Sequence, residues 1–396
     1  MNLTAAWDTL GFLLALATLP GSLELLTLTA AGLFWKPEPP LNFASALNLA
    51  VVIPSHNEEA NIQSCLESLL ACEFGGNRVQ TVVVADNCTD RTAPIATRMG
   101  ARVLNRNSAD RRGKGFALSF AFEQLLKEPF DAFIILDADT LVEKNFIHCF
   151  ADQFSRGAMA VQCRYLPADP GQSIRTGLMN LALIAFHVIR PRGRNRLGFS
   201  AGIFGNGFGL SRRALETTPY APGSITEDLE YHISLVRNGH RVLFEDRTTV
   251  RSLFPEDETT ASVQRSRWEG GRFRLMRSSI PILLKDLLRG KRPGLEALFD
   301  LTTLPLAFHV TLAILTALAF TGPVRGYACL ALAVVCFHLI SAIVAAGGWR
   351  DVAILLAAPG YMLWKIVRLP ITFNASRKDA KWIRTPRQKR QKGKTP

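Results

Sequence analysis

Hydrophobic residues concentrate toward the two ends of the 396-residue chain. Residues 10–34 are mostly apolar, and further apolar runs follow at 298–320, 327–346 and 352–367. About 20 apolar residues are needed to cross the hydrocarbon core of a bilayer. The pattern therefore predicts one membrane span before the middle of the chain and two spans after it, with 352–367 as an interfacial or third segment.

The first apolar segment has the features of a membrane helix rather than of a cleaved leader. Trp7 and Trp35 lie near its ends, and Trp prefers the membrane interface. No Lys or Arg precedes the segment, whereas a signal peptide begins with positive charge. Glu24 lies inside it, and we expect its carboxyl group to face other helices.

Between residues 47 and 258, short apolar runs alternate with segments of helical periodicity. The predicted strands are 47–53, 81–85, 102–104, 132–136 and 159–163, and the predicted helices are 61–71, 91–99, 116–126 and 144–154. Such alternation is typical of a mostly parallel α/β sheet. Ligands of these sheets lie beyond the carboxyl ends of the strands, so we expect the functional residues there.

Six regions follow from these patterns. They are an N-terminal transmembrane helix (1–36), a proline-rich linker (37–46), a globular domain (47–258), amphipathic interface helices (259–297), a C-terminal membrane region (298–373) and a basic tail (374–396). Three spans would keep the globular domain and the tail on one side of the membrane, whereas a fourth full span would separate them.

The positive charge of the chain is concentrated in this tail. Residues 377–396 contribute +8 of the net charge of +13, from nine Lys and Arg and one Asp. Basic segments beside apolar spans favour the cytoplasmic side, so the predicted location is the inner (cytoplasmic) membrane, multi-pass, with the globular domain in the cytoplasm. Nucleic-acid binding is the alternative explanation of the charge, but no motif for it is present and we expect no such partner.

Two carboxylates follow the strand predicted at 132–136. Asp137 and Asp139 are spaced i, i+2, and in an extended segment both point to the same side. Two hard oxygen ligands at the carboxyl end of a strand suit Mg²⁺ or Mn²⁺ carrying a diphosphate. A solvated turn is the alternative, because short Asp-x-Asp patterns are common.

The first two predicted strands also end in polar residues. Asp86 follows the second strand and could accept hydrogen bonds from a nucleobase or ribose, whereas Asp90 is better placed to cap the next helix. Pro54, Asn57 and Glu58 follow the first strand. They are predicted to lie at the same rim as Asp86.

Two glycine-containing segments permit close approach of the backbone to a ligand. Gly113-Lys114-Gly115 opens a predicted helix, and Lys114 provides a point charge for phosphate. An exposed surface lysine is the alternative, and the GxxxxGK[ST] pattern of a P-loop is missing. Gly205-Asn206-Gly207 is predicted at an acceptor, and it lacks the GxGxxG pattern of dinucleotide-binding proteins.

Acidic and basic groups also precede or occupy the later predicted helices. Asp228, beside Glu227, could deprotonate an acceptor hydroxyl, and simple capping of the helix that follows is the alternative. Further on, Arg267 could neutralise a leaving diphosphate and Trp268 could stack on a sugar ring. A membrane-surface helix also explains this basic stretch, and the two explanations are compatible.

The order of these motifs resembles that of the membrane-bound family 2 glycosyltransferases, which include cellulose, chitin, hyaluronan and poly-N-acetylglucosamine synthases. The motifs are Asp86, Asp137-Ala138-Asp139, Thr226-Glu227-Asp228 and Gln264 to Trp268, within residues 47–268. The resemblance implies an α/β GT-A fold, a Rossmann-like nucleotide-sugar-binding sheet flanked by transmembrane helices. It also implies an inverting hexosyl or N-acetylhexosaminyl transferase in cell-surface polysaccharide synthesis.

Together, the residues and the resemblance assign candidate roles. The catalytic residues are Asp228, as general base, and Glu227. The donor-binding residues are Pro54, Asn57, Glu58, Asp86, Lys114 and Asp137. The metal ligands are Asp139 and Asp137. The residues at the acceptor and diphosphate are Gly205, Asn206, Gly207, Gln264, Arg267 and Trp268.

The resemblance further implies a divalent cation, Mg²⁺ or Mn²⁺, as cofactor. Its implied partners are a nucleotide-sugar donor, with UDP as the family-level expectation, a glycan or lipid-linked acceptor, membrane lipid and other subunits of a polysaccharide synthesis or export system. Three functions stay open. The Gln264–Trp268 element favours a processive synthase, the small number of spans favours single addition to a lipid-linked acceptor, and a non-catalytic subunit would bind nucleotide sugar without transfer.

Overall fold

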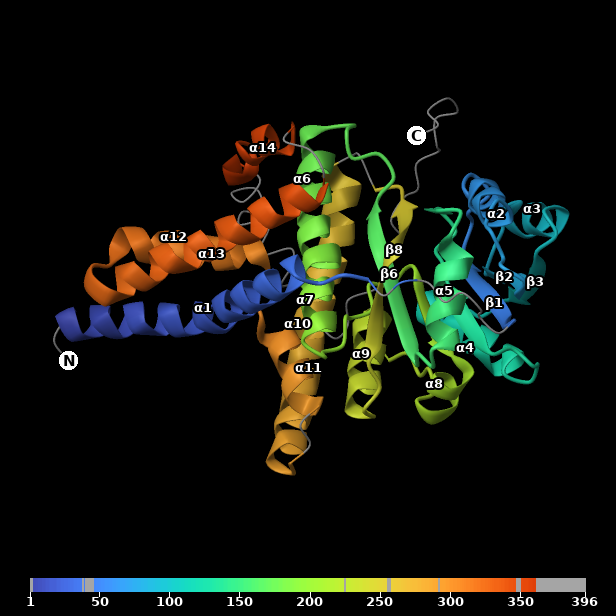
Figure 1. Cartoon of the computed structure of the whole chain (residues 1–396), viewed down its shortest axis with the longest axis horizontal. Helices are drawn as coiled ribbons and strands as arrows, with labels where there is room; N and C mark the ends of the chain where they lie inside the picture. The colour runs from blue at the N-terminus through green and yellow to red at the C-terminus, as the bar shows by residue number, and fades with distance from the viewer. Residues whose placement is uncertain are drawn as a thin grey trace. The chain divides into compact units, whose positions relative to one another are not determined.

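The computed structural model describes residues 3–37, 39, 46–223, 226–254, 258–290, 293–346 and 350–360 (Figure 1). Side chains are described for the same residues except 3, 4, 258–269, 293, 294, 346, 350 and 351. The chain forms two compact units. The first comprises Met1–Trp35, Gly171–Phe199 and Met276–Asn374, and the second comprises Lys36–Pro170, Ser200–Leu275 and Ala375–Pro396. The sheet lies in the second unit, and the long apolar helices lie in the first.

An eight-stranded sheet organises the second unit, in the order β3-β2-β1-β4-β7-β6-β8-β5. Its strands are β1 (Asn48–Ser55), β2 (Arg78–Asp86), β3 (Arg102–Arg106), β4 (Ala132–Ile135), β5 (Thr140–Val142), β6 (Ala160–Pro167), β7 (Phe208–Ser211) and β8 (Val242–Ser252). All five predicted strands are present, and β5, β7 and β8 were not predicted.

The sheet is mixed, so the expectation of a mostly parallel sheet holds for one half only. Strands β3, β2, β1 and β4 pair in parallel, and so do β6 and β8. Strand β7 is antiparallel to both β4 and β6, and β5 is antiparallel to β8. The parallel half ends at β4, whose other neighbour is the antiparallel strand β7. The chain enters β7 from β6 after passing through residues 171–199 of the first unit, so no crossover helix on the sheet connects these strands.

Helices of the second unit cover both faces of the parallel half (Figure 1). They are α2 (Ile62–Leu70), α3 (Thr92–Arg98), α4 (Lys114–Leu125), α5 (Phe146–Ser155), α8 (Arg212–Thr217) and α9 (Glu227–Arg237). In β1, Val51 packs into a core with α2 and α5, and Val52 packs into another with α4 and α9. Because both faces are covered, β1 reads as a continuous apolar run, which is why the sequence predicted it.

The first unit is helical, and α10 (Glu258–Leu288) contributes to both units. Its other helices are α1 (Leu3–Leu33), α6 (Ile174–Ile184), the π-helix η1 (Ala185–Ile189), α7 (Arg190–Arg196), α11 (Pro293–Thr302), α12 (Leu306–Ala319), α13 (Gly322–Ala346) and α14 (Arg350–Leu355). Within the described ranges, two helices are long and apolar enough to cross a membrane, at Ala5–Leu33 and Gly322–Ala345.

The run predicted as a span at 298–320 is not one straight helix. It is divided between α11 and α12, which are bent by 67°. Pro305 precedes α12, and because proline lacks an N–H group it favours a break between helices. Counting the bent pair as one span gives three candidate spans. The basic tail and residues 361–367 lie outside the described residues.

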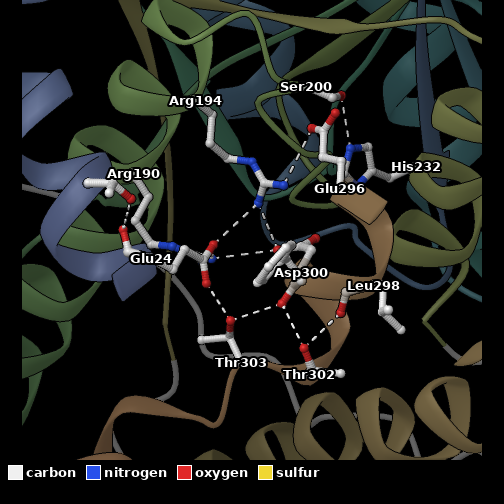
Figure 2. Close-up of polar contacts among 12 residues, drawn as sticks. Glu24, Arg190, Arg194, Ser200, His232, Glu296, Leu298, Asp300, Thr302 and Thr303 are labelled. Carbon is white, nitrogen blue, oxygen red and sulfur yellow. Dashed lines mark hydrogen bonds and ion pairs between the residues drawn. The ribbon is translucent and has the colours of Figure 1, made fainter. Parts of the chain in front are cut away.

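Glu24 of α1 faces other helices, as predicted, in a buried ion-pair cluster within the first unit (Figure 2). Its carboxylate accepts hydrogen bonds from Arg190 of α7 and from the hydroxyl of Thr303. Arg194 Nη1 lies 2.8 Å from Asp300 Oδ1 of α11. The side chains of Arg190 and Arg194 are only 4% and 6% exposed. The cluster therefore joins α1, α7 and α11 through charges shielded from water.

Replacing Arg194 by Met is expected to destabilise the first unit. The change removes the guanidinium nearest to Asp300, and breaking a buried ion pair costs about 3–5 kcal/mol of unfolding free energy. Thermal unfolding of the purified protein in detergent measures the effect, with Arg325→Met, at an exposed position of α13, as the control. Equal unfolding midpoints for the two variants would show that the cluster does not stabilise the fold.

Candidate active site

The carboxyl ends of three parallel strands meet where the strand order reverses. Strand β1 lies between β2 and β4, and open α/β sheets bind ligands in the crevice at such a switch point. Pro54 pairs with Val84 near the ends of β1 and β2, Asp86 is the last residue of β2, and Asp137 follows β4 by two residues. The fold thus brings these three predicted donor-binding residues to one edge of the sheet.

Two loops at this edge have a left-handed backbone. Asn57 and Asn87, with φ of 54° and 51°, are the two non-glycine residues with positive φ in the described part of the chain. Asn57 Oδ1 accepts a hydrogen bond from the Thr89 N–H at 2.7 Å, and Asn87 Oδ1 accepts one from the Ser108 N–H at 2.9 Å. Backbone strain of this kind, about 1–3 kcal/mol per residue, clusters at ligand sites.

Asp86 is held by a cation that the sequence analysis missed. Arg106 Nη1 donates to Asp86 Oδ1 at 2.5 Å, and Asn87 Nδ2 donates to the same oxygen at 2.9 Å. Asp86 is 5% exposed, so one of its carboxylate oxygens is fixed by neighbours. The parallel register of β2 and β3 places Asp86 opposite Arg106. This contact could be predicted only from the register, and the register is unknown until the strands are paired.

The neighbouring acids have local partners. Asp90 Oδ1 accepts a hydrogen bond from the Thr92 N–H at 2.9 Å, so it bonds the first residue of α3 from one position before the N-cap, which is Arg91. Glu58 is buried, and Asn61 Nδ2 donates to its Oε2 at 3.3 Å. Both acids therefore help to shape the loops after β1 and β2.

Lys114 connects the acids of the site. It is the first residue of α4, and its Nζ donates hydrogen bonds to Asp137 Oδ1 and to the carbonyl oxygen of Gly205. Burial by itself lowers the pKa of Lys114. The negative charge of Asp137, followed by those of Glu227 and Asp228, outweighs burial and raises it. The lysine is therefore a cation that balances three acids, one from the loop after β4 and two from the start of α9.

Asn206 forms the buried support behind Asp137. It is 0% exposed, and its Oδ1 accepts a hydrogen bond from the Asp137 N–H at 3.0 Å. Its Nδ2 donates to Thr140 Oγ1 at 2.8 Å and to Ser252 Oγ at 2.9 Å. Gln162 Nε2 donates to the carbonyl oxygen of Asn206 at 2.8 Å. The side chain of Asn206 thus fixes the loop after β4.

Glu227 and Asp228 begin α9, where the helix dipole favours negative charge. Burial, with the adjacent charge of Asp228, raises the pKa of Glu227 to about 7. Burial also raises the pKa of Asp228, although the Leu229 N–H donates to its Oδ1 at 2.9 Å. Asp228 Oδ2 lies beside Gly205, since a Cβ atom built on that glycine would be 3.0 Å away. Lys114 therefore contacts residues on both the Asp137 side and the Asp228 side.

Asp139 lies at a small pocket lined by Asn61, Ser64 and Cys65 of the α2 region, together with Leu141 of β5. Asn61 is 4% exposed, and its Oδ1 is a buried acceptor to which no described residue donates a hydrogen bond. Among the described residues, no group of three or more His, Cys, Asp or Glu is placed to hold one metal ion. Mg²⁺ characteristically uses one or two protein carboxylates and takes further oxygens from phosphate and water. The oxygen donors at this place fit such a hard cation.

The predicted Gln264, Arg267 and Trp268 fall on the backbone of α10, but their side chains lie outside the described part of the chain. The next described contact of this helix is at Gly271. A Cβ atom built there would lie 2.3 Å from Thr226 Cγ2, so α10 runs directly against the residue before Glu227. The site thus contains a fixed cation in Lys114, an acid pair whose pKa values are raised, and a group of oxygen donors around Asp139 that suits a hard divalent cation.

Comparison with known proteins shows similarity to glycosyltransferases. The sequence profile of the family described as "Glycosyltransferase like family 2" matches residues 47–271, which are more than half of the chain. Probable glycosyltransferase YdaM of Bacillus subtilis is 25% identical over 241 residues, which are 58% of this chain and 56% of that protein. Beta-monoglucosyldiacylglycerol synthase of Synechocystis sp. is 27% identical over 270 residues, which are 64% of this chain and 55% of that protein. The chain thus spans little more than half the length of these curated relatives.

One solved structure is similar along nearly the whole chain. Mannosyltransferase PcManGT from Pyrobaculum calidifontis, in complex with GDP-Man and Mn²⁺, has a TM-score of 0.54 and 18% sequence identity. The alignment covers 93% of this chain and 96% of that chain. At this identity the similarity shows a common fold, the GT-A fold.

Proposed function

Because the chain belongs to glycosyltransferase family 2, we propose that it is an inverting enzyme acting at a membrane. It moves a hexosyl or N-acetylhexosaminyl unit from a nucleoside-diphosphate sugar, with UDP as the expected nucleotide, to a lipid-borne acceptor. The contact of Lys114 with both Asp137 and the Gly205 carbonyl beside Asp228 carries this proposal. Donor and acceptor groups then lie within reach of one side chain.

Asp228 is the general base in this proposal. Its carboxylate takes the proton of the acceptor hydroxyl while the hydroxyl oxygen attacks the anomeric carbon, from the side opposite to the departing diphosphate. Proton transfer to a positioned carboxylate contributes about 10²–10⁴-fold to a rate. Lys114 supplies fixed positive charge beside the diphosphate that develops as the glycosidic bond breaks. The raised pKa of Glu227 lets this neighbour stay protonated near neutral pH, so that it does not compete with the base.

A divalent cation, Mg²⁺ or Mn²⁺, is the proposed cofactor. Asp139 and Asp137 would hold it, with Asn61 Oδ1 as a further oxygen donor near Asp139. When bound, such a cation stabilises charge on the diphosphate as a Lewis acid. The presence of Mn²⁺ in the PcManGT complex supports this assignment.

Asp139→Ala is expected to weaken Mn²⁺ binding and to remove activity. Loss of a residue that only supports a metal ligand lowers metal affinity by at least ~10-fold. Loss of the ligand itself should therefore lower the Mn²⁺ affinity by more than that. Electron paramagnetic resonance of free Mn²⁺ measures the affinity without turnover. Glu123→Ala, at an exposed position of α4, is the control. Unchanged Mn²⁺ affinity in Asp139→Ala, or full activity of the wild type in chelator, would contradict the metal site.

Membrane attachment at the cytoplasmic face is proposed on three grounds. Ala5–Leu33 and Gly322–Ala345 are long and apolar enough to span a bilayer. The sequence ends in a basic segment, which favours the cytoplasmic side. The name of the Synechocystis relative describes synthesis of a glycolipid, which supports an acceptor carried in the membrane.

Single addition to a lipid-borne acceptor is the form we propose, since the described helices provide few spans to build a polymer channel. A donor panel with purified protein in lipid, with Mg²⁺ or Mn²⁺, tests it by sizing the radiolabelled product. One sugar per acceptor supports single addition. Long polymers would instead support the processive function that the Gln264–Trp268 element favours. Binding of nucleotide sugar without any transfer would indicate a non-catalytic subunit and reject the proposed function.

A further inference from the structure

Three glycines from three elements pack against the start of α9. Gly115 belongs to α4, Gly205 to the loop before β7, and Gly271 to α10. Each lies where a Cβ atom would meet a residue of the loop leading to α9 or of its first turn. Gly115 also follows Lys114 in the chain, and the carbonyl oxygen of Gly205 accepts a hydrogen bond from Lys114 Nζ.

Gly115 sets the distance between α4 and the acid pair. A Cβ atom at this position would be 2.6 Å from Pro222 Cβ and 3.2 Å from Glu227 Cβ. The first contact is closer than real Cβ atoms come, and a proline ring cannot rotate away. Any side chain at Gly115 therefore pushes α4, with Lys114 at its first position, away from Glu227.

Gly205 and Gly271 pack closely against two further residues at the start of α9, Asp228 and Thr226. At Gly205, with φ of +80°, a Cβ atom would be 3.0 Å from Asp228 Oδ2. At Gly271, a Cβ atom would be 2.3 Å from Thr226 Cγ2. Thr226 is β-branched, so its χ1 rotamers are restricted and the methyl group has little room to escape. Thr226 is itself 7% exposed.

We propose that Gly115, Gly205 and Gly271 form a cradle around the start of α9. Because these three residues have no Cβ atom, the start of α9 can pack closely enough to place Asp228 correctly relative to Lys114 and the acceptor. This inference rests on the proposed function and identifies positioning residues for it. A displacement of about 1 Å at a reacting group can cost ~10²-fold in rate. The cradle predicts that adding a single methyl group lowers kcat while the donor still binds.

Gly271→Ala tests the cradle most directly, because its one contact under 3.0 Å is with a removable atom, Thr226 Cγ2. We expect kcat to fall about 10²-fold, with little change in the affinity for UDP-sugar measured by calorimetry. The double variant Gly271→Ala/Thr226→Ser lacks the Cγ2 atom that the new methyl group meets, and its kcat should recover most of the loss. Thr226→Ser alone provides the reference for the double variant.

Matched glycines control for the other effects of adding a methyl group. Gly171→Ala adds a Cβ atom at an exposed position with no atom within 4 Å. Gly100→Ala adds one at φ +83° with open space around it, which reproduces the backbone strain of Gly205→Ala without the Asp228 contact. Both controls should keep the wild-type kcat, whereas Gly205→Ala should lower it.

The cradle is overturned if Gly271→Ala and Gly205→Ala turn over like the controls, or if Thr226→Ser fails to restore the double variant. A loss of nucleotide-sugar binding equal to the loss of kcat would also overturn it, since that result indicates general disruption of the fold. Failure of the proposed function is a separate outcome, because it requires that the wild type transfer no sugar to any acceptor.

Discussion

Asp228→Asn is expected to reduce kcat by about 10²–10⁴-fold and to leave nucleotide-sugar affinity nearly unchanged. The amide cannot accept the proton of the acceptor hydroxyl, but it has almost the same shape as the carboxylate. Asp228 lies beside Gly205, which Lys114 contacts on the side away from its bond to Asp137 in the proposed donor site, so donor binding should remain intact. Single-turnover transfer and donor binding, measured on the same preparation, separate the two effects.

Asp8→Asn is the matched control, because Asp8 is exposed on α1 in the first unit. It makes the same chemical change outside the unit that contains the site and should turn over like the wild type. Retained turnover in Asp228→Asn would reject the assignment of the base. Loss of donor binding in that variant would instead place Asp228 in the donor pocket.

Lys114→Met is expected to decrease kcat by about 10²–10³-fold. This is the range found when one fixed electrostatic donor is removed from a transition state. The side chains of Lys114 and Asp137 are 23% and 27% exposed, so solvent only partly compensates for the lost charge. Lys127→Met, at an exposed position just after α4, is the control. Equal kcat values for the two variants would remove Lys114 from the mechanism.

The pH dependence of Lys114→Met gives an independent readout. Asp228 acts as a base only when it is ionised, so kcat rises with pH through its pKa. The charge of Lys114 lowers the pKa values of Glu227 and Asp228, opposing the effect of burial. Without this charge both pKa values rise, and the acid limb of the profile should move to higher pH.

Glu227→Gln should leave the acid limb nearly in place. Burial and the charge of Asp228 keep Glu227 protonated while Asp228 ionises, so the amide replaces a group that is already neutral. The charges that act on Asp228 are those of Lys114, which lowers its pKa, and Asp137, which raises it. A shift of the acid limb in Glu227→Gln as large as that in Lys114→Met would contradict this assignment of charges.

The sequence by itself was enough to predict the strands and helices that are encoded by a local pattern of apolar residues. Strand β1 is buried on both faces, and continuous burial requires an uninterrupted apolar run. Asp86 and Asp137 follow such runs, so their place at the rim of the sheet could be predicted before any strand was paired. Glu24 was predicted to face other helices, because a carboxylate facing lipid is costly.

The tertiary structure alone decided which of these groups meet. Lys114 contacts Gly205, which is 91 residues away, and the pairing of Asp86 with Arg106 depends on the register of β2 and β3. Strand β8 was missed because charged residues interrupt its apolar pattern. Its Arg247 is neutralised by Asp152 of α5, at 2.7 Å. Partners distant in the chain make these polar residues compatible with burial, and no periodicity along one segment encodes which partner will be there.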